Sequence, residues 1–304
     1  MEIPKTVQSL SKLQVLDLRY NKLVRLPPEV SNLPHLLTLL LNNNSLQVIP
    51  RNVGFLRQLR FLDVSNNVIC RLPRSTQELV ELRVLNCRDN ELVKLPNLGR
   101  LTNLTHLDCS GNMINALPYD FNGAIQPFVS MLRLADNVFR SIPMQNLERF
   151  HQLEYIDMDG NNIEMLPPSI RALASVKCLF LSRNKISFMS PEIGALSSLY
   201  RLHMDHNRLT ELPDSFKNLA ALRELSLCYN QFTEVPPVLT SLHLLSLKLS
   251  SNMIETFPEE VGELVSLDTL DLSDNMIHSL SPSIGQVSYP LSLPLSLWQE
   301  WTLT

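Results

Sequence analysis

The sequence lacks the short motifs that mark most catalytic sites. It has only eight glycines, and they form no glycine-rich phosphate loop. Neither GxSxG, the turn that carries a serine nucleophile, nor HExxH, a zinc-binding helix motif, occurs anywhere in the chain. We therefore expect a protein that is not an enzyme and that needs no cofactor.

The sequence also lacks an excess of positive charge and any long apolar run. Its formal net charge is −4, whereas a protein that binds nucleic acid needs a basic surface to neutralise phosphates. No run of about 20 apolar residues could span a bilayer. Residues 2–10 have no apolar core of the kind found in secretion signals. We expect a cytoplasmic protein without a membrane-spanning segment and without a nucleic-acid partner.

What the sequence has instead is a repeated unit. Residues 199–222 follow the pattern LxxLxLxxNxLxxLPxxΦxxL, where Φ is apolar and Met204 replaces one leucine. This pattern is typical of leucine-rich repeats. Twelve such units, most of them 23 residues long, begin at Leu13, Leu36, Leu59, Leu82, Leu104, Val129, Leu153, Val176, Leu199, Leu222, Leu244 and Leu267. We predict an α/β solenoid of the horseshoe type, with a parallel β-sheet on the concave face and short helical or irregular convex segments.

The ninth position of the unit is asparagine in every repeat. The twelve residues are Asn21, Asn44, Asn67, Asn90, Asn112, Asn137, Asn161, Asn184, Asn207, Asn230, Asn252 and Asn275. An asparagine side chain has two N–H donors and an acceptor, so it can pair with backbone groups that the turning chain leaves open. We predict a structural ladder and assign no binding role to these residues.

The five cysteines are few and scattered, with no cluster at either end of the repeats. Secreted repeat proteins of this type usually have such clusters. Cys87 and Cys109 occupy the sixth position of neighbouring units, where leucine is usual, and we interpret them as small core residues. We expect reduced thiols and a cytosolic location.

The pattern divides the chain into three parts. Residues 1–12 match only the back half of a unit, residues 13–287 form the twelve-unit domain, and residues 288–304 are a divergent tail. We interpret the tail as the end of a truncated protein, and the alternative is an unusual cap built on Trp298 and Trp301. The extra residues near 122–126 and 144–145 are expected on the outer face. Two units have serine in place of proline, in Met189-Ser190 and Leu280-Ser281, and should have altered convex turns.

Function must come from the inner face, because rigid strands present side chains there without a large ordering entropy. We expect the third, fifth, seventh and eighth positions of each unit to face the solvent. Aromatic residues and arginine, which are enriched at the energetic centres of interfaces, recur at these positions. The partner-binding residues that we predict are Phe61, Arg88, Arg133, Tyr155, Asp157, Asp159, Phe180, Arg183, Arg201, His203, Asp205 and Tyr229.

Two local patterns suggest other chemistry and are set aside. His203, Asp205 and His206 match no established metal-ligand spacing, so we interpret them as solvated residues of the binding surface. The segment 185–188 is similar to a docking motif for a phosphatase catalytic subunit, but its Ile186 stands at the apolar eleventh position. A docking peptide must be free and extended, and we therefore predict that Ile186 belongs to the core.

The second half of the units, as in LPPSIRAL at residues 166–173, resembles one intracellular branch of leucine-rich-repeat proteins. This branch includes the Ras-binding scaffolds and the Scribble- and Erbin-type polarity scaffolds, and the resemblance extends over residues 3–287. It implies a cytosolic adaptor for signal transduction that binds a Ras-like small GTPase or a phosphatase subunit on the concave face. We separately expect a monomer. No binding motif of the family can be carried over residue by residue.

Two other functional classes stay open. Plant Ras-group proteins and Roco GTPases have similar units, so the chain could be the recognition region of a larger enzyme, such as a Roco GTPase/kinase or a repeat-bearing phosphatase. The other class is an innate immune or ligand receptor domain, against which the missing secretion signal and cysteine clusters argue.

Overall fold

The computed structural model describes residues 3–118, 129–148, 150–256, 264 and 266–278, together with the backbone of residues 291–292. These residues divide between two compact units. The first unit comprises residues 1–139 and 143–156, and the second comprises residues 140–142 and 157–304.

Each repeat contributes one strand of three residues, at its third to fifth positions, to a parallel sheet. The first unit contains β1 to β6 in chain order: Val15–Asp17, Thr38–Leu40, Phe61–Asp63, Val84–Asn86, His106–Asp108 and Met131–Arg133. The second contains β9, β11, β12, β13, β14 and β15 in chain order: Cys178–Phe180, Arg201–His203, Glu224–Ser226, Ser246–Lys248, Thr269–Asp271 and Leu291–Ser292. Strand β7, Tyr155–Asp157, spans the unit boundary. Equivalent residues of successive repeats are paired, as Leu202 is with Leu225.

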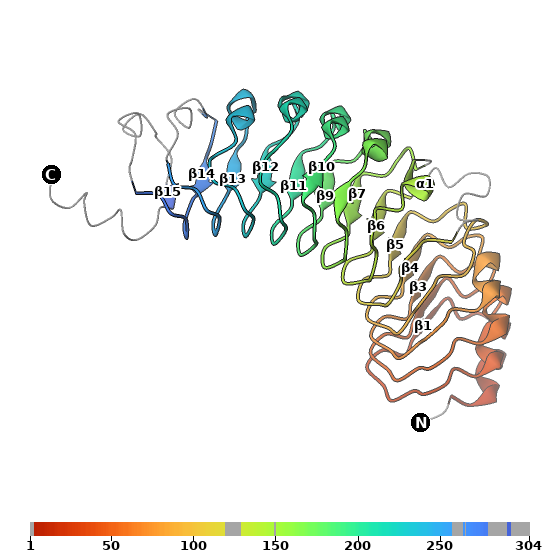
Figure 1. Cartoon of the computed structure of the whole chain (residues 1–304). Helices are drawn as coiled ribbons and strands as arrows, with labels where there is room; N and C mark the ends of the chain where they lie inside the picture. Colours follow the sequence, from red (N-terminus) through yellow and green to blue (C-terminus); the bar gives the residue numbers. More distant parts are fainter. Residues whose placement is uncertain are drawn as a thin grey trace. The chain divides into compact units, whose positions relative to one another are not determined.

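The core of each unit lies between this sheet and a row of short helices (Figure 1). The helices are the 3-10 segments η1 to η4, at Lys5–Ser9, Pro28–Asn32, Arg51–Phe55 and Arg74–Glu78, helix α1 at Met144–Leu147, and the 3-10 segments η6 to η9, at Pro168–Leu173, Pro191–Ala195, Asp214–Asn218 and Pro237–Ser241. The central strand leucines, such as Leu39 and Leu202, are fully buried. Burial of one such side chain contributes about 1.5–3 kcal/mol to the free energy of unfolding. The many leucines buried between stacked repeats therefore stabilise the fold together. The predicted fold class is confirmed.

The asparagine ladder forms as the sequence predicts. In one rung, Nδ2 of Asn207 donates to the carbonyl oxygens of Leu181 and Met204, at 2.9 and 3.0 Å, and Oδ1 accepts from the backbone N–H of Ile186 at 2.9 Å. Asn207 therefore joins its own repeat to the preceding one. Because Ile186 is fully buried, its N–H would have no access to water without this acceptor.

Cysteine and isoleucine side chains that the sequence assigned to the core are buried. Cys87 and Cys109 are fully buried free thiols with their Sγ atoms 3.1 Å apart, which confirms them as core residues. Burial raises the pKa of Cys109 well above its usual range. The burial of Ile186 confirms that segment 185–188 is not a free docking peptide.

The outer segments show two departures from a uniform repeat. At Met189-Ser190 the hydroxyl of Ser190 accepts a hydrogen bond from the N–H of Glu192 and so caps the N-terminus of η7. The other described outer helices have a proline at this capping position. The same repeat forms a second small sheet, because β10, Phe188–Met189, pairs with β8, Met165–Leu166. Of the two predicted insertions, residues 144–145 begin helix α1 on the outer side. The insertion at 122–126, the turn at Leu280-Ser281 and all of the tail except the β15 backbone lie outside the described residues. The domain boundaries stay a prediction.

Candidate protein-binding surface

The sheet face opposite the core, here called the inner face, presents the third and fifth residues of each repeat to solvent, except Ser226, which is buried. Alternation along the strand produces this arrangement, because the fourth residue points into the core. In β11, for example, Leu202 is fully buried while Arg201 and His203 are half-buried. Rigid strands therefore hold the candidate residues at fixed positions.

The seventh position is less exposed than the sequence led us to expect. Ser65, Ser110 and Ser182 are buried there. Asp159 and Asp205 are half-buried, and each has one carboxylate oxygen already occupied. The seventh position follows the strand at the start of the turn, and at Asp159, Ser182 and Asp205 its side chain accepts a hydrogen bond from a backbone N–H of the next repeat.

The eighth position has a left-handed backbone in every repeat, a feature that our sequence analysis missed. Its φ is 54° at Arg183, 55° at Tyr229 and 64° at Gly111. A non-glycine residue in this region carries a strain of about 1–3 kcal/mol, which the surrounding turn must offset. The frequent Asn, Asp and Gly at this position were the available signal, because these residues tolerate positive φ best.

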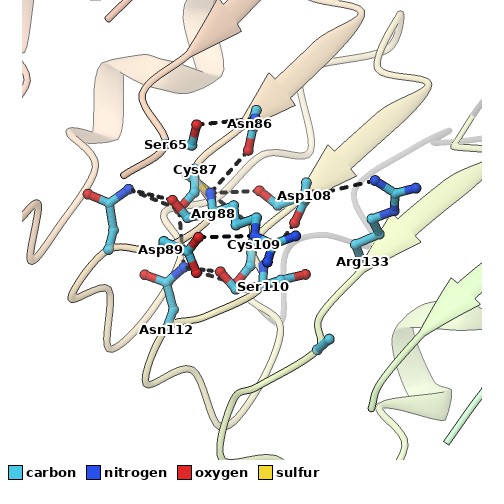
Figure 2. Close-up of polar contacts among 12 residues, drawn as sticks. Ser65, Asn86, Cys87, Arg88, Asp89, Asp108, Cys109, Ser110, Asn112 and Arg133 are labelled. Carbon is cyan, nitrogen blue, oxygen red and sulfur yellow. Dashed lines mark hydrogen bonds and ion pairs between the residues drawn. The ribbon is translucent and has the colours of Figure 1, made fainter. Parts of the chain in front are cut away.

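In the first unit, charged side chains pair on the inner face (Figure 2). Nε of Arg88 lies 3.0 Å from Oδ2 of Asp89, and this partner raises the pKa of Arg88. Nη1 of Arg133 lies 3.8 Å from Oδ2 of Asp108, and its guanidinium carbon is 5.2 Å from the ring centre of Tyr155. The structure thus brings predicted residues Arg133 and Tyr155 together. Asp108 was absent from the prediction, although its fifth position could have identified it.

In the second unit, aromatic and charged side chains form pairs on consecutive repeats. Arg201 makes a bidentate ion pair with Glu224, at 2.5 and 2.7 Å. Phe180 meets the ring of His203 edge-on at 5.0 Å, and His206 stacks on Tyr229 at 4.0 Å. We call these six residues the second-unit cluster. Of its members, His206 and Glu224 were not among the twelve predicted binding residues.

The electrostatics of this cluster follow from its pairs. The ion pair raises the pKa of Arg201 and lowers that of Glu224, because each charge stabilises the other. Burial is the main cause that lowers the pKa of His203. Burial thus favours the uncharged imidazole of His203 beside the Arg201–Glu224 ion pair.

Two carboxylates near the cluster serve the fold. Oδ1 of Asp205 accepts from the hydroxyl of Ser226 at 2.6 Å and from the N–H of Cys228 at 2.8 Å. Oδ1 of Asp159 accepts from the N–H of Ser182 at 2.6 Å. Burial and the nearby charge of Asp157 raise the pKa of Asp159 to about 7.

Phe61 and Arg183 are two further predicted residues that the structure describes. Phe61 is half-buried on β3 in the first unit, and Arg183 is exposed at a left-handed turn in the second. Within the described residues, no group of three or more His, Cys, Asp or Glu side chains is arranged to hold a metal ion. No helix among the described residues is both long and apolar enough to cross a bilayer.

Family profiles cover most of the chain. A profile described as leucine-rich repeat region matches residues 124–240, one described as leucine rich repeat matches residues 11–69 and 221–277, and a two-copy repeat profile matches residues 80–120. The chain is a leucine-rich-repeat protein. Proteins of this family are generally non-enzymatic binding modules, and their repeat domains bind protein partners.

Solved structures agree on the fold of this leucine-rich-repeat protein. A leucine-rich-repeat protein of Leptospira interrogans is 27% identical with a TM-score of 0.80, and the match covers 96% of this chain and 81% of that one. An internalin from Listeria monocytogenes is 22% identical with a TM-score of 0.79, covering 95% and 88%, and shows the fold alone.

A plant receptor gives a third comparison. It is the repeat ectodomain of the membrane receptor kinase GASSHO1/SCHENGEN3 from Arabidopsis thaliana, in complex with CASPARIAN STRIP INTEGRITY FACTOR 2. It is 30% identical with a TM-score of 0.79, and the match covers 96% of this chain but only 37% of the receptor. No curated protein matches the sequence closely enough to count as a relative.

Proposed function

We propose that this chain is a non-enzymatic interaction scaffold in intracellular signal transduction, and that a protein partner binds the inner face of its second unit. The second-unit cluster carries the proposal. It places two aromatic rings, two imidazoles and one ion pair on three consecutive repeats. Aromatic and arginine side chains contribute most of the binding energy in protein interfaces.

The cluster is preorganised, which favours binding. Arg201 is held by Glu224 and Phe180 is held against His203, so association would immobilise few additional side-chain rotamers. An immobilised rotamer-rich side chain costs about 0.5–1.5 kcal/mol. A partner that covers the Arg201 ion pair must supply hydrogen bonds to it, which gives specificity.

The partner class that we propose is a Ras-like small GTPase or a phosphatase subunit in the cytoplasm. The LPxxΦxxL half-repeats support it through their resemblance to intracellular scaffolds. The five free cysteines, of which Cys70 is exposed, fit a reducing compartment.

A second candidate is the ligand-recognition part of a larger protein, such as a receptor or a repeat-bearing enzyme. The similarity to the plant receptor ectodomain favours it, because that ectodomain is much longer and was solved with a ligand bound. This candidate places the same inner face at the centre of recognition.

Affinity capture from cytosol tests the first proposal. One bait is the whole wild-type chain. The other is a Phe180→Ala/Tyr229→Ala variant, which removes the Phe and Tyr rings of the cluster and leaves the core unchanged. A matched control is Phe188→Ala/Tyr200→Ala, which removes one Phe and one Tyr of the same unit, 49% and 41% exposed, outside the inner face.

We expect the control to retain a small GTPase or phosphatase subunit that the cluster variant loses by about tenfold or more, since interface aromatics are typical hot spots. Equal retention of that partner by both variants would overturn the inner-face site. Capture of an extracellular peptide ligand, and of no cytosolic partner, would favour the receptor alternative.

A further inference from the structure

A basic groove runs along the flank of the first unit, away from the inner face. The groove crosses three consecutive repeats, at the segments that connect the eleventh position of each repeat to its outer side. It is lined by residues 48–51, 71–75, 77 and 94–97. Its volume is about 1180 Å³. This exceeds the ~300–1,000 Å³ typical of small-molecule pockets, so the groove suits a chain segment better than a metabolite.

Four cations line this groove and no acidic residue does. They are Arg51, Arg71, Arg74 and Lys94. All four are exposed, and in the part of the chain that the structure describes none of them takes part in an ion pair. Glu78, an acidic residue of the neighbouring η4, is already bonded to Arg100 at 2.6 Å. The groove therefore has uncompensated positive charge.

The wider charge distribution favours an anionic occupant at this end of the chain. Residues 1–156 contain 17 Lys and Arg against 13 Asp and Glu, whereas residues 157–304 contain 9 against 17. A net positive half within an acidic protein attracts an acidic partner by long-range steering.

The cations stand in two rows that follow the repeat axis. Arg71 and Lys94 occupy the thirteenth position of consecutive repeats, and Arg51 and Arg74 occupy the sixteenth. Pro50 and Pro73 lie between the rows and provide apolar walls. A segment lying along the axis would contact both rows and could pair several carboxylates at once. Arginine binds carboxylates through two parallel N–H groups, which strengthens each contact.

We propose that this groove binds an extended peptide segment rich in Asp and Glu, contributed by a partner protein. In an extended chain, alternate side chains project on the same side of the backbone. Carboxylates at every second position would then face the cations of the groove together. This site is independent of the inner face.

Direct binding of a labelled peptide to the whole chain tests the proposal. The probe has twelve residues with Glu at every second position and Ser or Ala between, and the control probe has Gln in place of Glu. The test variant is Arg71→Gln/Arg74→Gln. The matched variant is Arg57→Gln/Arg60→Gln, which removes two exposed arginines from adjoining repeats without altering the lining. Thermal unfolding establishes that both variants fold.

We expect the Glu peptide to bind, to weaken as salt rises, and to lose about tenfold in affinity in the groove variant while the matched variant loses less than about twofold. Equal losses in both variants would show general attraction without a site and overturn the proposal. Equal binding of the Gln peptide, or no binding of the Glu peptide at low salt, would do the same. A 20-base-pair DNA duplex that binds the same groove more tightly than the Glu peptide would overturn the proposal, because the ligand would then be a nucleic acid.

Discussion

At the residue scale, single positions of the repeat have different physical tasks. The ninth-position asparagines could be predicted from the sequence, because all twelve repeats have one and an amide side chain has the groups that the turn needs. The role of Asp159 could not be predicted, because its raised pKa depends on burial in the folded chain and on the nearby charge of Asp157. The same is true of the Phe180 and His203 contact, which joins variable positions of two repeats.

Asp159 makes the stability of the protein depend on pH. Its pKa is about 7 in the folded chain, against 3.8 for an ordinary Asp. The folded protein therefore holds a proton that the unfolded chain releases, and stability falls as pH rises from about 4 to about 7. Asp159→Asn removes this contribution. Urea unfolding between pH 4 and 8 should show the variant gaining stability relative to wild type over that window.

Asp268→Asn is the control for this prediction, since it removes an exposed carboxylate of the same unit. It should leave the wild-type pH profile unchanged. A constant difference between Asp159→Asn and wild type at every pH would mean that Asp159 titrates normally in the folded protein.

At the element scale, the outer helices set the spacing between repeats. The prolines predicted the outer turns, and 3-10 segments follow most of them. The pairing of β8 with β10 was not foreseen, because it depends on how two neighbouring flanks meet and has no period in the sequence. Gly54 shows how closely η3 and η4 approach: a Cβ built there would lie 2.6 Å from the carbonyl oxygen of Ser75.

Gly54→Ala should therefore destabilise the protein by about 1–3 kcal/mol, because a backbone carbonyl cannot move aside as a flexible side chain can. Urea unfolding measures the loss. Gln77→Ala, at the equivalent position of the next repeat, is the control and should change stability by less than about 0.5 kcal/mol. Similar losses of stability in the two variants would mean that η3 and η4 can move apart at no cost in free energy.

At the scale of the whole molecule, periodicity in the sequence was sufficient for the fold class. Each repeat buries its apolar face only against its neighbours, so twelve matching units specify a solenoid. The binding surface was only partly predictable. The third and fifth positions are at least partly exposed in the repeats, apart from the buried Ser226, but pairs such as His206 with Tyr229 arise between repeats, where the pattern leaves residue identity open. The basic groove likewise depends on three adjacent repeats having cations on one flank.

The most direct test of the inner-face site is photo-crosslinking in cells from single positions. A photoreactive phenylalanine analogue replaces Phe180 on the inner face in one protein and Phe188 on the flank in another, eight residues apart in the chain. The inner-face account predicts that the partner captured by the wild-type chain crosslinks from position 180 and not from position 188. Crosslinking of that partner from position 188 alone would contradict it and move recognition to the flank.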